Sequence, residues 1–213
     1  MRYKAILFDM DGTLLDTLTD MADAVNHILS VHGWPLRTTE EVRAFVGNGA
    51  RRLMERAVPP EVTGGDFEAV LTEYRDWYQT HNCVATAPYP GIPGLLAALA
   101  EAGIKTAVVS NKPDATTKTL AARFFPGLPA FGQRDDVPPK PAPDLVFRAL
   151  ETLGVDAADA IYVGDSEVDV ATARNAGLPL AAVSWGFRGR RALAEAGAAV
   201  IVDTAAELLE VLR

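Results

Sequence analysis

Five short apolar runs, each ending in polar residues, constrain the fold of this chain more than any other feature. They are AILFD (5–9), TAVVS (106–110), AIYVGD (160–165), LAAVS (180–184) and AAVIVD (198–203). Near-continuous Val, Ile, Ala and Leu of this length are typical of strands that are buried on both faces of a parallel sheet. Helical patterns alternate with these runs, so the sequence predicts an α/β fold in which right-handed crossovers connect the strands of a Rossmann-like parallel sheet.

The connection between the first two runs is much longer than a crossover requires. It covers residues 10–105, whereas a crossover needs only about a dozen residues, usually one helix. The helical segment 92–102 already supplies that helix. We therefore predict that residues 17–82 form an inserted all-α cap domain, and that residues 1–16 together with 83–213 form the α/β core.

Apolar spacing inside the predicted cap supports this division. Two stripes have the periodicity of amphipathic helices, one of Leu18, Met21, Val25, Ile28 and Leu29, the other of Phe67, Val70, Leu71, Tyr74, Trp77 and Tyr78. Between them, Thr38 and Glu41 have capping-box spacing ahead of a short helix that ends near Val46. A further short helix is predicted from Ala50 to Val58. Four helices with two strong apolar stripes can bury a small core of their own.

The composition of the 213 residues narrows the possible partners. Hydrophobic residues make up 49% and charged residues 23%, which is ordinary for a globular protein that can fill a core. The net charge of −8 argues against nucleic acid or an anionic membrane as the main partner, but a local cluster of Lys, Arg and metal can still attract a small anion. Cys83 is the only cysteine, which fits a reducing compartment. With no visible signal peptide and no apolar run of bilayer length, we expect a cytoplasmic protein, of unspecified oligomeric state.

Polar residues follow several of the predicted strands, and ligands bind at the carboxyl ends of the strands in open parallel sheets. The positions are Asp9 and Asp11 after the first run, Ser110-Asn111-Lys112 after the second, Lys140 in the loop VPPKPAP, and Asp165 and Asp169 in GDSEVD. Four carboxylates, a lysine and a hydroxyl are therefore predicted to meet at one rim of the sheet.

These groups suit phosphoryl transfer. A carboxylate can attack phosphorus and form an acyl phosphate, which divides one difficult displacement into two easier ones. Mg²⁺ prefers oxygen ligands, and it would relieve the repulsion between an attacking aspartate and an anionic substrate. A lysine and a hydroxyl can hold the phosphoryl oxygens, and a second carboxyl group can give a proton to the leaving oxygen and take one from water. Gly12 permits a tight turn, so that backbone groups can approach the phosphate.

Four motifs in this order resemble those of the haloacid dehalogenase superfamily of phosphotransferases. They are DxDGTLxD at 9–16, Ser110 after the second run, Lys140 in KPxP, and GDxxxD at 164–169. A helical insert after the first motif is one of the cap types of that superfamily. Within it, the chain looks most like bacterial phosphoglycolate phosphatases, on the stretches VRAFVGNGARRLMERAV (42–58), APYPGIPGLL (87–96), SNKP (110–113) and VGDSEVDVATARNAGLP (163–179).

The resemblance implies catalytic and substrate-binding roles for the motif residues. Asp9 would be the nucleophile and Asp11 the general acid/base, while Ser110 and Lys140 would bind the phosphoryl group. Further candidates for contacts on the substrate side are Thr13 and Asn111. The dehalogenase branch lacks the second aspartate of the first motif, so the presence of Asp11 favours phosphoryl transfer over hydrolysis of a carbon–halogen bond.

The resemblance also implies a metal site. Asp9, the backbone carbonyl of Asp11 and Asp165 would ligate Mg²⁺. Asp169 would be either a further ligand or a residue that holds one in place. Its spacing from Asp165 would put both carboxylates on the same side of a helical turn.

Other polar residues have more ordinary explanations. Asp16 is predicted to begin the first cap helix as an N-terminal acid, and Lys112 is expected only to be exposed. In the cap, Arg43, Arg51 or Arg52 could contact a substrate carboxylate beyond the phosphate, with Arg51 as the candidate, or could form a solvated basic face. The three histidines lack metal-ligand spacing, and the three tryptophans are expected to pack.

Together, the motifs and the resemblance predict a Mg²⁺-dependent phosphatase for a small phosphorylated metabolite, with 2-phosphoglycolate as the favoured substrate. Two alternatives share the same motifs. One is a phosphatase or phosphomutase for a phosphosugar, a nucleotide or another metabolite, because the cap rather than the core would choose the substrate. The other is a phospho-receiver module that keeps phosphate on Asp9 without turnover, against which stand Asp11 and the large cap.

Overall fold

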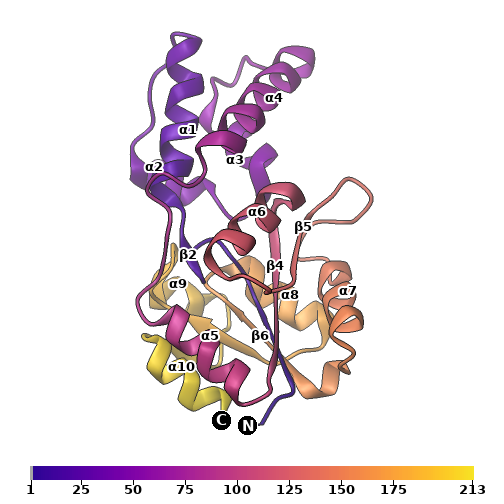
Figure 1. Ribbon diagram of the computed structural model, residues 1–213. Coiled ribbons are helices and arrows are strands. Elements are labelled where there is room, and N and C mark those ends of the chain that lie inside the picture. Colours follow the sequence, from indigo (N-terminus) through magenta and orange to yellow (C-terminus); the bar gives the residue numbers. More distant parts are fainter. Residues whose placement is uncertain (1) are drawn as a thin grey trace. The chain divides into compact units, whose positions relative to one another are not determined.

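The computed structural model describes residues 2–213, and the chain divides into two compact units (Figure 1). One unit consists of Met1–Asp16 together with Pro88–Arg213, and the other is the continuous segment Thr17–Ala87. The second unit therefore extends past residue 82, where the sequence placed the end of the cap.

A parallel sheet occupies the first unit and confirms the predicted α/β class. Within residues 2–213 the sheet has six strands in the order β5-β4-β1-β6-β7-β8, which are β1 (Ala5–Phe8), β4 (Lys105–Pro113), β5 (Ala130–Gln133), β6 (Ala160–Gly164), β7 (Leu180–Val183) and β8 (Ile201–Val202). Neighbouring strands are parallel, and Phe8 of the central strand β1 lies opposite Val108 and Val163. All of β1 is buried, as the apolar run predicts. Strand β5 was not predicted, because AFGQ carries no comparable apolar run.

Helices cover this sheet, and residues with known capping preferences stand at both ends of α7. The helices are α5 (Ile92–Glu101), α6 (Asp114–Phe124), α7 (Asp144–Leu153), α8 (Glu167–Ala176), α9 (Gly189–Glu195) and α10 (Ala205–Leu212), with a 3₁₀ turn η1 (Ala157–Asp159). Helix α7 follows Pro143 and ends at Gly154, whose φ of 62° is the left-handed conformation that favours glycine. On one face of the sheet, Ala5 and Leu7 pack in a cluster with apolar residues of α7 and α8. Helices α5 and α10 pack against each other (Figure 1).

The second unit, all of which is described, is helical. Its four helices are α1 (Leu18–Val31), α2 (Thr39–Phe45), α3 (Gly49–Ala57) and α4 (Gly64–His81). The two predicted apolar stripes are buried except for Trp77, which is half-buried and stacks between the rings of His27 and His81. Thr38 caps α2 and Glu41 completes the capping box, as their spacing predicts.

The chain passes between the units through two short strands, β2 (Leu15–Asp16) and β3 (Ala87–Pro88), which pair with each other. Asp16 belongs to β2 and is exposed, whereas α1 begins only at Leu18 and the acid in its first turn is Asp20. The prediction that Asp16 begins the helix is therefore wrong, because pairing with β3 keeps the chain extended at that residue.

Asp20 joins the end of the helical unit to its beginning. Its buried carboxylate accepts hydrogen bonds from the backbone N–H groups of Val84 (3.0 Å), Ala85 (2.8 Å) and Thr86 (2.9 Å). The hydroxyl of Thr86 donates a further bond of 2.6 Å. These bonds explain why the unit continues to Ala87 instead of ending near residue 82.

Replacing Asp20 with Asn should lower the free energy of unfolding by about 3 kcal/mol, because charge-assisted bonds are lost and the new amide nitrogen faces backbone donors. Urea denaturation followed by tryptophan fluorescence measures the change. Asp23→Asn is the matched control, since Asp23 is exposed on the same helix, and its stability should stay within about 0.5 kcal/mol of the parent. Equal losses in the two variants would contradict the role assigned to Asp20.

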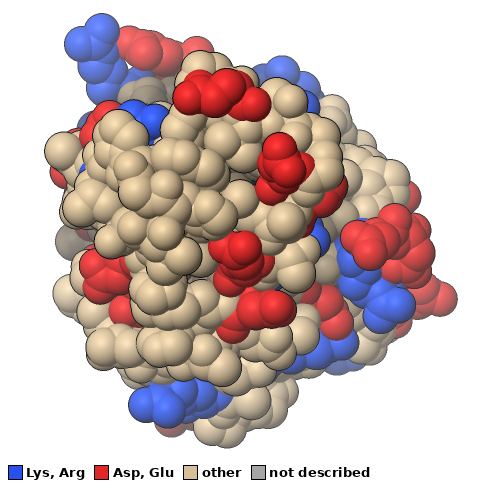
Figure 2. All heavy atoms as spheres, turned by 90° about the horizontal axis from the view of Figure 1, so that it is seen from above, with Lys and Arg blue, Asp and Glu red and all other residues tan. Residues whose placement is uncertain are grey.

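Charged side chains are interspersed over the surface. The chain carries 28 acidic and 20 basic side chains, and Lys and Arg form no continuous basic area on the face drawn in Figure 2. Among the helices of residues 2–213, none combines the length and the apolar character that crossing a membrane requires.

Candidate active site

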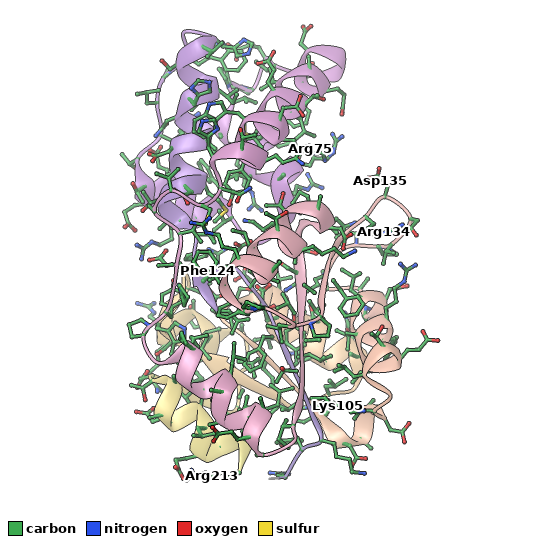
Figure 3. All side chains as sticks on the ribbon, viewed as in Figure 1. Arg75, Lys105, Phe124, Arg134, Asp135 and Arg213 are labelled. Atoms are coloured by element: carbon green, nitrogen blue, oxygen red, sulfur yellow. The ribbon has the colours of Figure 1, made fainter. Side chains whose placement is uncertain are left out.

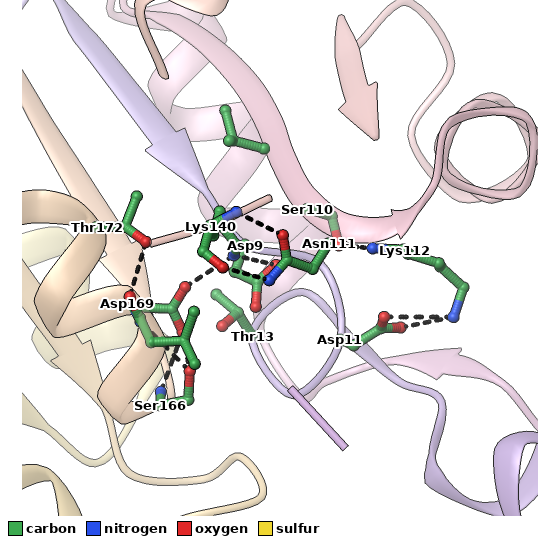
Figure 4. Close-up of polar contacts among 12 residues, drawn as sticks. Asp9, Asp11, Thr13, Ser110, Asn111, Lys112, Lys140, Ser166, Asp169 and Thr172 are labelled. Atoms are coloured by element: carbon green, nitrogen blue, oxygen red, sulfur yellow. Dashed lines mark hydrogen bonds and ion pairs between the residues drawn. The ribbon is translucent and has the colours of Figure 1, made fainter. Parts of the chain in front are cut away.

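The carboxyl ends of the central strands bring together the residues that the sequence singled out. Asp9 directly follows β1, Ser110-Asn111-Lys112 lie near the end of β4, Lys140 lies in the loop before α7, Asp165 directly follows β6, and Asp169 lies in the first turn of α8. Figure 4 labels these residues except Asp165 and marks polar contacts among them. Lys105, labelled in Figure 3, begins β4 and therefore lies at the opposite edge of the sheet.

Three aspartates form a buried acidic cluster in this group. One carboxylate oxygen from each of Asp9, Asp165 and Asp169 lies within 4.8 Å of the other two. Burial, followed by the negative charge of Asp169, raises the pKa of Asp9 to about 7 even though Lys140 opposes the change. Burial likewise raises the pKa of Asp165 well above its ordinary value, and the charges of Asp169 and Asp9 add to the effect. Such a cluster is stable in its ionised form only beside a cation.

Lys140 supplies one cation from within the chain. Its Nζ lies 2.9 Å from Oδ1 of Asp9, 2.9 Å from Oδ1 of Asp169 and 3.0 Å from the hydroxyl of Tyr162. Burial lowers the pKa of Lys140, but the charges of Asp169 and Asp9 outweigh burial and hold it well above the ordinary value. Asn111 fixes the backbone of this lysine, since its Nδ2 donates to the Lys140 carbonyl (3.0 Å) and its Oδ1 accepts from the Lys140 N–H (2.7 Å).

The acidic cluster also fits a bound metal ion. Its donors are carboxylate oxygens, which Mg²⁺ prefers. The 2.9 Å contact between Lys140 and Asp9 is an ion pair without hydrogen-bond alignment, so Oδ1 of Asp9 is buried with a lone pair still available to a cation. These three aspartates were among the predicted metal residues.

Asp11 stands apart from that cluster. Its two carboxylate oxygens lie 3.0 and 3.3 Å from Nζ of Lys112, and Figure 4 shows the pair directed away from Asp9 and Asp169. Lys112 is buried, so the expectation that it is only exposed is wrong. The Asp11 side chain is thus paired with Lys112. The group of Asp11 that the resemblance assigns to the metal is its backbone carbonyl.

Thr13 and Ser110 are both buried at this rim. The hydroxyl of Thr13 donates to Oδ1 of Asp165 at 3.3 Å, and the hydroxyl oxygen of Ser110 accepts from the backbone N–H of Lys112 at 3.2 Å. Thr13 therefore contacts a member of the acidic cluster. The roles of both residues in substrate binding remain predictions.

The loop after β7 contributes to the site although sequence reasoning assigned it no role. The N–H of Phe187 donates to Oδ2 of Asp165 (2.7 Å), and Nε1 of Trp185 donates to the carbonyl of Thr13 (3.0 Å). Gly186 lies so close to the Gly12 carbonyl and to Asp165 that a Cβ at this position would overlap them. Trp185 was expected only to pack. The sequence offered one signal for this role. The loop follows the apolar run LAAVS (180–184), so it lies at the same rim as the ends of the other strands.

Arg51 lies in the helical unit, on α3. Its guanidinium donates to both carboxylate oxygens of Glu68, at 2.8 and 2.7 Å, and lies over the ring of Phe67. The other two arginines considered from the sequence also have carboxylate partners, Arg52 with Glu55 and Arg43 with Glu40. A contact between Arg51 and a substrate carboxylate stays a prediction, and such a substrate would compete with Glu68.

The geometry combines the parts that a phosphoryl transfer requires. A buried carboxylate faces an ammonium group, two further carboxylates complete an oxygen-rich cluster, and a fourth carboxylate lies to one side. Groups of these types on one rim can act as nucleophile, charge stabiliser and proton carrier.

Comparisons with known proteins agree with this geometry. The family model of the haloacid dehalogenase-like hydrolases matches residues 6–183. The N-acetylmuramic acid 6-phosphate phosphatase of Pseudomonas aeruginosa is 36% identical over 221 residues, covering 100% of this chain and 96% of the relative. The phosphoglycolate phosphatase of Cupriavidus necator is 37% identical over 210 residues, covering 94% and 89%. A crystal structure from Lactobacillus delbrueckii subsp. bulgaricus has a TM-score of 0.94 and 37% identity, covering 100% of this chain and 99% of the other.

Proposed function

The chain belongs to the haloacid dehalogenase-like hydrolases and is a phosphatase, and from this premise we propose a Mg²⁺-dependent phosphomonoesterase that works through an aspartyl phosphate. The observation that carries the proposal is the contact of the Lys140 ammonium with Asp9 inside the acidic cluster. A carboxylate held there beside a cation is placed to attack an anionic phosphoryl group.

In the first step, a carboxylate oxygen of Asp9 forms a bond to phosphorus while the bond from phosphorus to the ester oxygen breaks. Asp11 gives its proton to the departing oxygen, which leaves as an alcohol. Lys140 offsets the charge of the phosphoryl oxygens, because its ammonium already lies 2.9 Å from Asp9. The phosphoryl group is then carried on Asp9 as an acyl phosphate.

In the second step, the acyl phosphate is hydrolysed. Asp11, now a carboxylate, takes a proton from water as the water oxygen attacks phosphorus, and the bond between phosphorus and Asp9 breaks. Inorganic phosphate leaves and Asp9 is again a carboxylate. Atoms and protons balance over the two steps, with one water consumed for each ester.

Asp9, Asp165 and the backbone carbonyl of Asp11 are proposed to hold Mg²⁺, with Asp169 beside them. When bound, Mg²⁺ would favour the ionised form of Asp9 and offset the negative charge shared by the cluster and the phosphoryl group. Asp169 also forms a capping box with Ser166, whose N–H (3.1 Å) and hydroxyl (2.6 Å) donate to its Oδ2. That contact fixes the carboxylate at the start of α8.

We propose 2-phosphoglycolate as the favoured substrate, with N-acetylmuramic acid 6-phosphate as the second candidate. The support comes from the two relatives named for these esters, which match the chain at nearly equal identity. Both esters carry a carboxylate in addition to the phosphate. The helical unit Thr17–Ala87 is proposed to act as the cap that recognises this second group.

A panel of matched phosphomonoesters tests the proposal. 2-Phosphoglycolate is compared with its amide, and N-acetylmuramic acid 6-phosphate with N-acetylglucosamine 6-phosphate, which lacks the lactyl carboxylate. Phosphate release is measured with Mg²⁺ and after treatment with EDTA. We expect Mg²⁺-dependent turnover that is faster, by about tenfold or more in kcat/KM, for the carboxylate-bearing member of one pair.

Each alternative has its own result in this panel. Equal rates on 2-phosphoglycolate and its amide would reject 2-phosphoglycolate as the specific substrate. A preference for N-acetylmuramic acid 6-phosphate would establish the second candidate. A stable phosphoaspartate on Asp9 without phosphate release would overturn the phosphatase mechanism and favour the receiver module.

A further inference from the structure

The Lys112–Asp11 ion pair joins two segments that are far apart in the sequence. Asp11 lies in the turn after β1, and Lys112 lies near the end of β4. The Lys112 side chain is only 3% exposed and that of Asp11 19%, so the pair is largely withdrawn from water. The mechanism proposed above uses Asp11 but assigns nothing to Lys112.

The alternation of side chains along β4 separates the two neighbours Asn111 and Lys112. Successive residues of a strand point to opposite faces of the sheet. Accordingly, Asn111 binds the backbone of Lys140 while its neighbour Lys112 reaches Asp11 (Figure 4).

The ion pair separates Asp11 from the acidic cluster. Asp11 is only two residues from Asp9, yet the three carboxylates gathered within 4.8 Å are those of Asp9, Asp165 and Asp169. A fourth carboxylate among them would add repulsion and compete for the cation. Lys112 instead pairs with the Asp11 carboxylate at 3.0 Å, directed away from Asp9 and Asp169 (Figure 4).

We propose that Lys112 is a positioning residue for proton transfer by Asp11, an inference that rests on the proposed phosphatase function. Lys112 keeps the Asp11 side chain outside the metal cluster and directed to the side on which the leaving group departs. In the first step the P–O ester bond breaks as the bond from Asp9 to phosphorus forms, and the ester oxygen takes the proton of Asp11. Lys112 neither gives nor receives a proton.

Leaving groups of different basicity test this role. An alkyl phosphate releases a strongly basic oxygen that needs a proton, whereas p-nitrophenyl phosphate releases a weakly basic phenolate that hardly does. Hydrolysis of the acyl phosphate is common to both substrates, so kcat/KM is compared, which reports the steps up to the departure of the leaving group. Lys112→Met should therefore lower kcat/KM on 2-phosphoglycolate about 100-fold and kcat/KM on p-nitrophenyl phosphate less than about 3-fold. Asp11→Asn should show the same selectivity.

The double variant Asp11→Asn/Lys112→Met completes a cycle. If Lys112 acts through Asp11, the second substitution should add almost nothing to the loss caused by the first. Lys112→Arg should recover part of the rate on the alkyl ester, because it restores the charge. Lys105→Met, on the same strand at the opposite edge of the sheet, should leave the ratio of the two rates unchanged.

Each contrary result has a definite meaning. Equal loss on both substrates, or additive losses in the double variant, would overturn the positioning role. A loss on 2-phosphoglycolate that lies entirely in a higher KM, with kcat unchanged, would show that Lys112 binds the substrate carboxylate instead. The ratio of kcat/KM values in one preparation does not depend on the fraction of folded protein, so poor folding cannot mimic the expected result. If the parent protein shows no turnover that depends on Asp9, the proposed function itself is rejected. If the parent turns over but Lys112→Met lacks the expected selectivity, only the positioning role is rejected.

Discussion

Asp9→Asn should abolish turnover, by about 10⁴-fold or more in kcat, and should make the metal-free protein more stable at neutral pH. The loss of activity follows because an amide cannot form the acyl phosphate. The gain in stability follows because Asp9 is buried beside Asp165 and Asp169, where its ionised form is disfavoured. Function and stability therefore oppose each other at this residue.

The gain should depend on pH with a definite sign. The pKa of Asp9 is raised from 3.8 to about 7. Between these two pH values the folded parent keeps a proton on Asp9 that the unfolded chain has already lost. The stability of the metal-free parent should fall between pH 4 and pH 7, by roughly 1.4 kcal/mol per pH unit for this one group. The Asn variant lacks this fall, so its advantage should be small near pH 4 and largest above pH 7.

Thermal or urea unfolding in EDTA at several pH values, together with phosphate release at saturating Mg²⁺, measures both effects. Asp23→Asn removes an exposed carboxylate and should change neither quantity. Retained turnover in Asp9→Asn would remove Asp9 as the nucleophile. A stability difference that stays flat with pH would show that Asp9 is ionised in the folded protein throughout the range.

Lys140→Met should have the second-largest effect, because it removes the cation inside the acidic cluster. Asp9 and Asp169 would lose the ammonium that lies 2.9 Å from each of them. Breaking a buried ion pair from one side typically costs 3–5 kcal/mol, so we expect a loss of about 4 kcal/mol in the metal-free protein. We also expect kcat/KM to fall by about 10³-fold, because charge on the phosphoryl oxygens is no longer offset.

Metal binding should change in the opposite direction in this variant. Without the competing ammonium group, the acidic cluster should bind Mg²⁺ about tenfold more tightly, which isothermal titration calorimetry can measure. Lys118→Met is the matched control, because Lys118 is exposed and pairs with Asp114 on the surface of α6. It should cost less than about 0.5 kcal/mol. Weaker Mg²⁺ binding in Lys140→Met would show that the lysine supports the metal site instead of competing with it.

Much of the candidate site could be predicted because three of the five apolar runs stop where a candidate site residue begins, at Asp9, Ser110 and Asp165. Asp9 directly follows Phe8 and Asp165 directly follows Gly164, so strand ends and motif residues coincide. In a parallel sheet those ends share one edge, and no knowledge of side-chain direction was needed. The capping box of Thr38 was predictable for a similar reason, since it depends only on local spacing.

The parts that escaped prediction depend on distant backbone. The partner of Lys112 is Asp11, which lies 101 residues away in the sequence, and β5 has no apolar run by which to find it. The contact of Phe187 with Asp165 uses a backbone N–H, which nearly every residue type carries. Asp20 was missed because its three N–H partners lie more than 60 residues along the chain.

The helical unit is one uninterrupted stretch, Thr17–Ala87, bounded by the paired strands β2 and β3. A single exchange of gene segments at those two strands would replace the entire unit and leave Asp9, Lys140 and their neighbours untouched. The hydrogen bonds from Val84 and Thr86 to Asp20 lie within the exchanged segment. The segment therefore contains the contacts that join its end to its beginning. If the helical unit recognises the substrate as proposed, this architecture would let a lineage acquire a new substrate by recombination while the residues of the candidate active site stay unchanged.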